Sequence, residues 1–247
     1  MPGHVVSIWR HPIKGHGREE MAAVDLRAGQ TIAGDRAWAV LHEAARTKGG
    51  EWAPCANFSR GSQTPALQGI RATTRADGRM VLTHPDLAEI TIDPARDSAA
   101  FVAWVTPLVD PKRAQPRALV PAGARGMTDT DYASVSLINL ASHRTFEQTA
   151  GRPLNVLRWR GNLLVDGLAP WEEFDWIGRE VRIGAATLRI REPIVRCNAT
   201  RADPATGKVD FDTLALLNTR WGHQDFGVYA EVTAPGAIEA GASVTLA

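Results

Sequence analysis

Cysteine is scarce in this sequence, which has 247 residues but only two cysteines, Cys55 and Cys197. Two cysteines in a chain of this length do not form the dense disulfide framework of small secreted proteins, which favours a reducing compartment. Long apolar runs are also lacking, since no stretch of about 18 apolar residues occurs that could span a bilayer. Residues 1–10 lack the basic head and apolar run of a signal peptide. We therefore expect a cytoplasmic protein with no membrane partner.

Net charge is nearly absent as well, at +1 near neutral pH with a sequence pI of about 7.9. Such a balance excludes recognition of nucleic acid or an acidic membrane by bulk charge. The seven histidines are spread singly, and no pair has the spacing of a zinc site, so we expect no structural zinc. Electrostatic recognition must therefore come from a local pocket.

Many short strands punctuated by glycine, with few helices, make up most of the chain. Asp77-Gly78 separates two of these strands and suits a tight hairpin turn. The predicted strands cover residues 5–9, 22–26, 37–42, 70–74, 80–83, 89–92, 163–165, 180–183, 187–191, 228–233 and 243–246, and the predicted helices cover residues 99–108, 142–149 and 211–217. The pattern predicts a β-rich α+β fold dominated by a β-barrel.

A domain junction is predicted within residues 110–117, where two prolines and three basic residues interrupt the apolar pattern. We place an N-terminal β-rich region over residues 1–115 and a second domain over residues 116–247. The first helix of the second domain has two candidate N-caps, Ser142 and Asn139.

Cys197 carries the clearest chemical signal of the sequence. It follows a predicted strand, and Arg191, Arg196 and Arg201 lie close to it along the chain. Clustered positive charge lowers the pKa of a thiol and favours the thiolate, which attacks electrophiles or binds a soft metal. A lone cysteine is also often a packed, buried residue. The local pattern leaves both interpretations open.

Two further segments carry basic side chains suited to an anion. Arg158 and Arg160 precede a predicted strand, and their spacing predicts that they share one strand face. Arginine offers a planar fork for phosphate, and the amide of Asn162 both donates and accepts hydrogen bonds. A solvated strand edge is the alternative. Lys14 lies in a glycine-containing loop, but the spacing of a Walker motif is missing.

Six segments, in order, resemble the MOSC family, named after the C-terminal domain of molybdenum cofactor sulfurase. The segments are His11-Pro12-Ile13-Lys14, Gly34-Asp35-Arg36-Ala37-Trp38, Ser134-Val135-Ser136-Leu137-Ile138-Asn139, Arg160-Gly161-Asn162-Leu163, Arg196-Cys197 with Asp203-Pro204-Ala205-Thr206-Gly207, and Phe226-Gly227-Val228-Tyr229 with Gly236 and Gly241. The closer likeness is to the subgroup of amidoxime-reducing molybdoenzymes. The resemblance implies an N-terminal β-barrel-like region packed against a MOSC β-barrel with a few short helices, and a ligand in the cleft between them.

The resemblance also implies a molybdenum-pterin cofactor, molybdopterin. Cys197 resembles the family's metal ligand and is the implied catalytic residue. The positions implied in cofactor binding are Lys14, Gly15, Arg36, Ser136, Arg160, Asn162, Arg196 and Asn198. Gly15 departs from the family, which usually has serine there, so a backbone N–H would have to replace a hydroxyl. Cys55 receives no role beyond that of a packed thiol.

Three functions remain open from the sequence. The first is an oxidoreductase that reduces N-hydroxylated small molecules with the cofactor. The chain has no cysteine cluster for an iron–sulfur centre, so separate electron-transfer proteins are expected as partners. The second is a sulfur or cofactor carrier that holds a persulfide, or the pterin, at Cys197 without turnover of its own. The third is a scaffold that binds neither, which the Gly15 departure favours.

Overall fold

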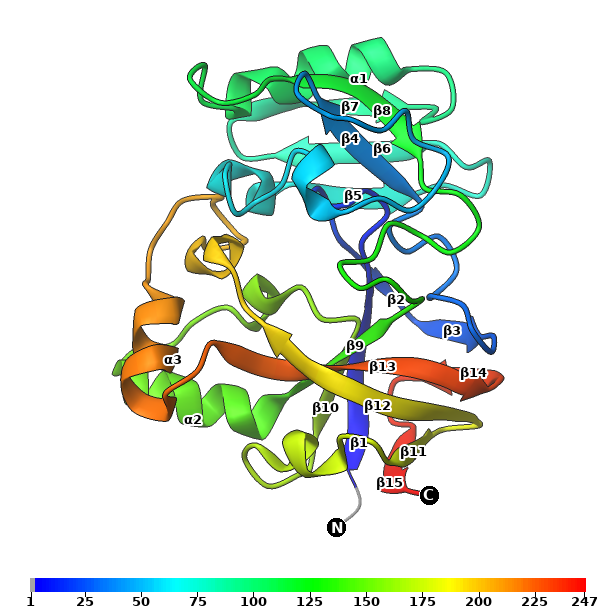
Figure 1. The fold of residues 1–247 in the computed structure, drawn as a ribbon, viewed down its shortest axis with the longest axis vertical. Coiled ribbons are helices and arrows are strands. Elements are labelled where there is room, and N and C mark those ends of the chain that lie inside the picture. Colours follow the sequence, from blue (N-terminus) through cyan, green and yellow to red (C-terminus); the bar gives the residue numbers. More distant parts are fainter. Residues whose placement is uncertain (1–2) are drawn as a thin grey trace.

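A closed β-barrel forms the lower half of the computed structural model, which describes residues 3–247 (Figure 1). Seven strands follow the order β10-β9-β13-β12-β11-β15-β1, and β1 pairs with β10 to close the barrel. Their bounds are β1 (Gly3–Arg10), β9 (Val135–Asn139), β10 (Leu163–Asp166), β11 (Glu180–Ile183), β12 (Ala186–Val195), β13 (Asp225–Ala234) and β15 (Ser243–Leu246). β2 (Glu19–Met21) extends the sheet beside β1, and β3 (Ala23–Leu26) pairs with β14 (Gly236–Glu239).

Alternating apolar and polar residues explain why these segments enclose a core. In β11, Val181 and Ile183 are buried whereas Arg182 between them is exposed. Leu188 and Ile190 of β12 are buried in the same alternation. Because successive side chains of a strand point to opposite faces, one face of every strand fills the interior. All seven barrel strands contribute to this core, which confirms the β-rich fold.

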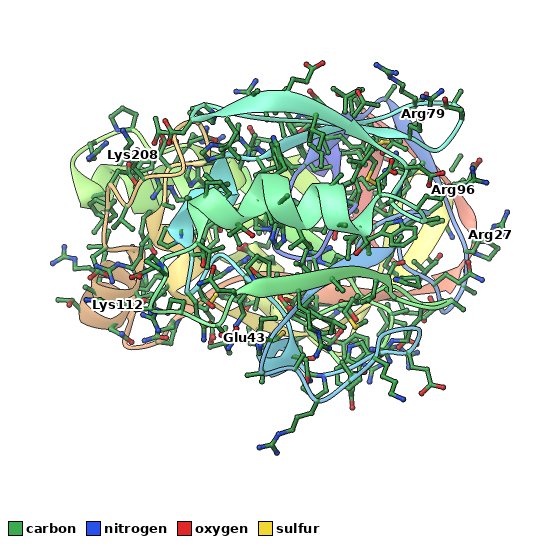
Figure 2. The ribbon with its side chains drawn as sticks, turned by 90° about the horizontal axis from the view of Figure 1, so that it is seen from above. Arg27, Glu43, Arg79, Arg96, Lys112 and Lys208 are labelled. Carbon is green, nitrogen blue, oxygen red and sulfur yellow. The ribbon has the colours of Figure 1, made fainter. Side chains whose placement is uncertain are left out.

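The N-terminal half lies above the barrel in Figure 1 and has its own core. Its strands are β4 (Trp38–His42) paired with β8 (Pro116–Pro121), and β5 (Arg71–Thr74), β6 (Met80–His84) and β7 (Leu87–Ile92) in an antiparallel sheet. Helix α1 (Ser98–Val105) contacts β7 and β8 and buries Phe101. In Figure 2, α1 lies across this half, and the labelled Arg79 and Arg96 point away from the body.

Two longer helices, α2 (Leu140–Ala150) and α3 (Thr213–Trp221), cover the outside of the barrel. The side chain of Asn139 accepts a hydrogen bond from the second residue of α2 at 2.9 Å, so Asn139 and not Ser142 caps this helix. Gly151 ends α2 with a φ of 69°, a conformation that glycine adopts without strain. Across residues 3–247, none of the helices is both long and apolar enough to cross a bilayer.

Aromatic side chains fill the space between the helices and the barrel. Trp159 stacks on Phe226 with 3.9 Å between ring centroids, and Phe146 contacts both edge-on. Short 3₁₀ helices link the elements, with bounds η1 (Cys55–Asn57), η2 (Pro65–Gly69), η3 (Thr106–Leu108), η4 (Val156–Trp159), η5 (Glu172–Trp176) and η6 (Asn198–Arg201).

Two strands pair with strands on the other side of the predicted division into residues 1–115 and 116–247. β1 comes from the start of the chain but closes the C-terminal barrel, and β8 begins at Pro116 but pairs with β4 of the N-terminal half. The segment predicted as a junction, residues 110–117, thus runs directly into a strand. The division itself stays a prediction, while these two strands tie the halves together.

Candidate functional site

A cavity of about 520 Å³ lies where the N-terminal half meets the barrel. It falls within the usual size range of small-molecule and cofactor sites. Seven of the nine positions singled out by the resemblance line it: Lys14, Gly15, Arg36, Ser136, Arg160, Arg196 and Cys197. These residues are far apart in the sequence, and only the folded chain brings them together. Their roles toward a ligand stay predictions.

Cys197 lies at the wall of this cavity with an exposed side chain. The interpretation as a buried, packed cysteine is therefore wrong. Cys197 follows β12 and caps η6, and its carbonyl accepts hydrogen bonds from the N–H of Thr200 at 3.1 Å and its hydroxyl at 3.0 Å. Both bonds hold the backbone at Cys197, and neither involves the sulfur atom.

The three arginines near Cys197 in sequence do not gather around it. Arg191 pairs with Glu231, and Arg201 pairs with Asp212 at 3.1 Å. Only Arg196 lines the cavity, and its guanidinium donates to the carbonyls of Trp159 at 2.7 Å and of Phe226. The expected cluster of three charges at the thiol thus reduces to one.

Lys14 is buried and already bound by groups of the protein. Its ammonium donates to the carbonyls of Met127 at 2.9 Å and Thr128 at 3.2 Å and forms an ion pair with Asp129. Desolvation by the cavity walls raises the pKa of Asp129, but Lys14 and Arg36 outweigh it and hold this pKa below its usual range. The charge of Lys14 is therefore neutralised within the chain.

Cys55 also lines the cavity, although sequence reasoning gave it no role. Its thiol donates a hydrogen bond to Asp129 Oδ1 at 3.0 Å. Burial and the neighbouring carboxylate both raise the pKa of Cys55, so this thiol stays protonated at neutral pH. No spacing could reveal the contact, because the two residues lie 74 positions apart.

Three arginines that line the cavity, Arg60, Arg160 and Arg196, have no carboxylate partner among residues 3–247. Among residues 3–247, the side chain of Arg160 makes only long hydrogen bonds, to Gln68 Oε1 at 3.4 Å and the Gly17 carbonyl at 3.3 Å. Burial and the nearby cations lower the pKa of Arg160 to about 9. The cavity therefore holds uncompensated positive charge, which suits an anionic group.

Arg158 and Arg160 do not share a strand face, and that prediction is wrong. Arg158 lies within η4, and Arg160 follows it in a left-handed conformation with a φ of 51°. Arg158 pairs with Asp210 at 3.1 Å and donates to the Thr200 carbonyl at 3.2 Å. Of the two, Arg160 is the one free to meet an anion.

Asn162 and Asn198 lie outside the cavity lining. The Asn162 amide is buried: its oxygen accepts from the Ser136 hydroxyl at 2.8 Å, and its nitrogen donates to the Trp9 carbonyl at 3.0 Å. Asn162 thus fixes Ser136, which does line the cavity. Asn198 is exposed at the start of η6.

The chain favours glycine at position 15 for a steric reason. Gly15 has a φ of 73°, and a Cβ there would approach Arg60 Cα and the Ser59 carbonyl to 3.1 Å. A serine at this position would therefore crowd the segment that carries Arg60, and glycine fits there.

Tyr229 is a cavity residue that sequence reasoning did not assign. Val228 and Ala230 on either side of it are buried in the barrel, so strand alternation directs Tyr229 to the opposite face. Burial raises the pKa of its phenol above the ordinary value, as does the charge of Asp129. This alternation was the signal available in the sequence.

The MOSC domain family model matches residues 125–245, and the MOSC N-terminal beta barrel domain matches residues 2–108. Molybdenum cofactor sulfurase from Anopheles gambiae is 32% identical over 117 residues, which is 42% of this chain and 15% of that protein. Molybdenum cofactor sulfurase from Drosophila grimshawi is 29% identical over 110 residues, which is 44% of this chain and 14% of that protein. The chain therefore matches only a small part of these relatives.

Solved structures are similar only at a distance. The YUAD protein from Bacillus subtilis has a TM-score of 0.46 at 12% identity, covering 99% of this chain and 94% of its own. YiiM from Geobacillus stearothermophilus has a TM-score of 0.36 at 22% identity, covering 46% of this chain and 53% of its own. The two family models together span nearly the whole sequence. The chain thus belongs to the MOSC family, with a MOSC N-terminal β-barrel domain followed by a MOSC domain.

Proposed function

We propose that this protein binds a molybdenum-pterin cofactor through Cys197 and reduces N-hydroxylated small molecules with electrons from separate proteins. One observation carries the proposal: an exposed thiol shares a cavity with three arginines that lack a carboxylate partner among the described residues. A thiolate is a soft ligand suited to such a metal, and the arginines suit the phosphate of the pterin. The relatives named molybdenum cofactor sulfurase support a function related to this cofactor.

The residues present fit such a group. Cys197 would supply the thiolate, and Arg160 and Arg60 would neutralise the phosphate. The hydroxyl of Ser136, oriented by Asn162, and the backbone of Gly15 would complete the polar contacts. Lys14 would contribute indirectly, by holding Asp129 in place, because its own charge is already paired with that carboxylate.

The bound cofactor would supply two-electron oxygen-transfer chemistry. Reduction of an N–OH group to N–H with release of water consumes two electrons and two protons. The raised pKa values of Cys55 and Tyr229 keep protons on Sγ and Oη at neutral pH. The Tyr229 hydroxyl would therefore donate a hydrogen bond into the cavity, whereas the Cys55 proton is already held by Asp129.

An activity assay tests the proposal. Protein produced in cells that make the cofactor should reduce benzamidoxime to benzamidine when an electron donor is supplied, and Cys197→Ser should not. Metal-loaded protein that shows no turnover with several donors would count against a reductase.

The second candidate is a sulfur or cofactor carrier, which the exposure of Cys197 and the sulfurase names of the relatives favour. Here Cys197 would hold a persulfide or the pterin for delivery to another enzyme. Mass spectrometry of the intact protein separates the candidates: a persulfide on Cys197 without molybdenum supports the carrier. Unmodified Cys197 with bound molybdenum supports the reductase.

A further inference from the structure

The loop that carries Cys197 is held by the N-terminal half of the chain through one buried amide. Gln68 lies at the end of η2 and is 1% exposed. Its Nε2 donates to the carbonyl of Ala199, two residues after Cys197, at 2.9 Å. Its Oε1 accepts from Arg160 at 3.4 Å. One side chain therefore contacts both the cysteine loop and an unpaired cation of the cavity.

Arg18 holds the other end of the same loop. Its guanidinium donates to the backbone carbonyls of Gln68 and Ile70 in the N-terminal half and to that of Pro204 in the loop. Arg18 is buried, so these carbonyls replace the water that its charge loses. Two side chains from one half thus hold residues 199 and 204 of the other.

Close packing accompanies these hydrogen bonds. A Cβ at Gly61 would lie 3.3 Å from the Cβ of Ala199 and 3.5 Å from Cγ of Gln68. A Cβ at Gly207 would lie 2.7 Å from the carbonyl of Ala66, in η2 beside Gln68. The loop therefore contacts η2 with little free space, and its place depends on that helix.

We propose that Gln68 is a positioning residue that sets where Cys197 and Arg160 lie in the cavity. Its significance rests on the proposed function, in which Cys197 is the metal ligand. The amide is suited to this task because it donates on one side and accepts on the other, and a fixed rotamer links the two. The N-terminal half is thereby part of the site even though Gln68 itself does not line the cavity.

Two substitutions separate the two contacts. Gln68→Met keeps the size of the side chain and removes both hydrogen bonds. Gln68→Glu keeps an acceptor for Arg160 but faces the Ala199 carbonyl with a carboxylate oxygen, so it breaks only the contact to the loop. Gln63→Met, an exposed position of the same segment, is the matched control.

The experiment uses the full chain prepared without the cofactor. Hydrogen exchange should become roughly fivefold faster or more in residues 198–204 of both Gln68 variants, while the strands of the barrel keep their protection. At one fixed pH, the rate of alkylation of Cys197 by iodoacetamide should also change relative to that of Cys55 in the same sample, because the loop that carries Cys197 loses a contact. A residue that contributes only to global stability would change exchange throughout the chain and would leave the ratio of the two alkylation rates unchanged.

The proposal is overturned if folded Gln68→Met matches the wild type in loop exchange and in the ratio of the two alkylation rates. Should Gln68→Met not fold, Gln68→Glu decides instead, because it breaks the contact to Ala199: unchanged exchange in residues 198–204 of this variant would overturn the proposal. Neither readout uses molybdenum or activity. A wild-type protein that binds no molybdenum would therefore contradict the proposed function while leaving this result intact.

Discussion

Glu173 offers a quantitative test of how the fold handles a buried acid. Its side chain is fully buried in η5 and accepts hydrogen bonds from Asn139 at 2.7 Å and Ser142 at 2.9 Å, at the start of α2. Burial raises the pKa of this carboxyl from 4.5 to about 7, against the opposing effect of these hydrogen bonds. The substitution Glu173→Gln keeps the shape of the side chain and removes its titration.

The sign follows from proton linkage. The folded protein binds this proton more tightly than the unfolded chain does, so folding is favoured while the group is protonated in both states. The free energy of unfolding therefore decreases as the pH rises from about 4.5 to about 7. At about 1.4 kcal/mol for each pH unit, the wild type should lose about 3 kcal/mol relative to Glu173→Gln across this range.

Urea unfolding of both proteins at intervals between about pH 4.5 and pH 7.5 measures this difference. Subtracting the two curves cancels the titration of all other groups. Asp175→Asn, an exposed acid of the same 3₁₀ helix, should give a nearly constant difference from the wild type. Parallel pH curves for the wild type and Glu173→Gln would refute the argument that burial controls this carboxyl.

Three other substitutions have defined outcomes. Asp129→Asn removes the negative charge beside the thiol of Cys55, so the pKa of Cys55 should fall and its alkylation near pH 8 should become several times faster, as measured by site-resolved mass spectrometry; an unchanged rate would contradict the pairing. Phe226→Ala removes a fully buried ring that stacks on an indole and should cost about 3–5 kcal/mol in urea unfolding, where a loss below about 1 kcal/mol would be inconsistent with this packing. Gly227→Ala should destabilise more than Gly222→Ala, because both have positive φ but only a Cβ at Gly227 meets a backbone carbonyl, at 2.5 Å; equal losses would show that this contact relaxes freely.

Local patterns predicted the elements that depend on local physics. The alternation in β11 and β12 follows from side-chain direction. The need of backbone N–H groups for partners narrowed the cap of α2 to Ser142 or Asn139, and the structure selects Asn139. The hairpin at Asp77-Gly78 joins β5 and β6 as its turn chemistry suggested. Such features require information from only a few neighbouring residues.

Long-range pairing was beyond this reasoning. Nothing within β1 indicates that its partners are β10 and β15, and the prolines at both ends of β8 concealed an edge strand. Arg160 was misplaced on a strand because its left-handed backbone depends on the end of η4. These outcomes are decided by tertiary context, which overrides local preference.

The candidate site divides in the same way. The resemblance gave Cys197, Arg160 and Ser136, and the fold brings them to one cavity. The resemblance could not show that Asp129, 115 positions from Lys14 in the sequence, neutralises that lysine, or that the thiol of Cys55 donates to the same carboxylate. Ion pairs between distant segments leave no spacing in the sequence, so only the folded chain reveals which cations remain uncompensated.

The central claim is that the sulfur of Cys197 holds molybdenum, and metal analysis of protein from cofactor-producing cells tests it most directly. We predict about one molybdenum per chain in the wild type, its loss in Cys197→Ser because a hydroxyl is a poor soft-metal ligand, and its retention in Cys55→Ser. Wild-type protein without molybdenum, or Cys197→Ser that retains it in full, would contradict the account.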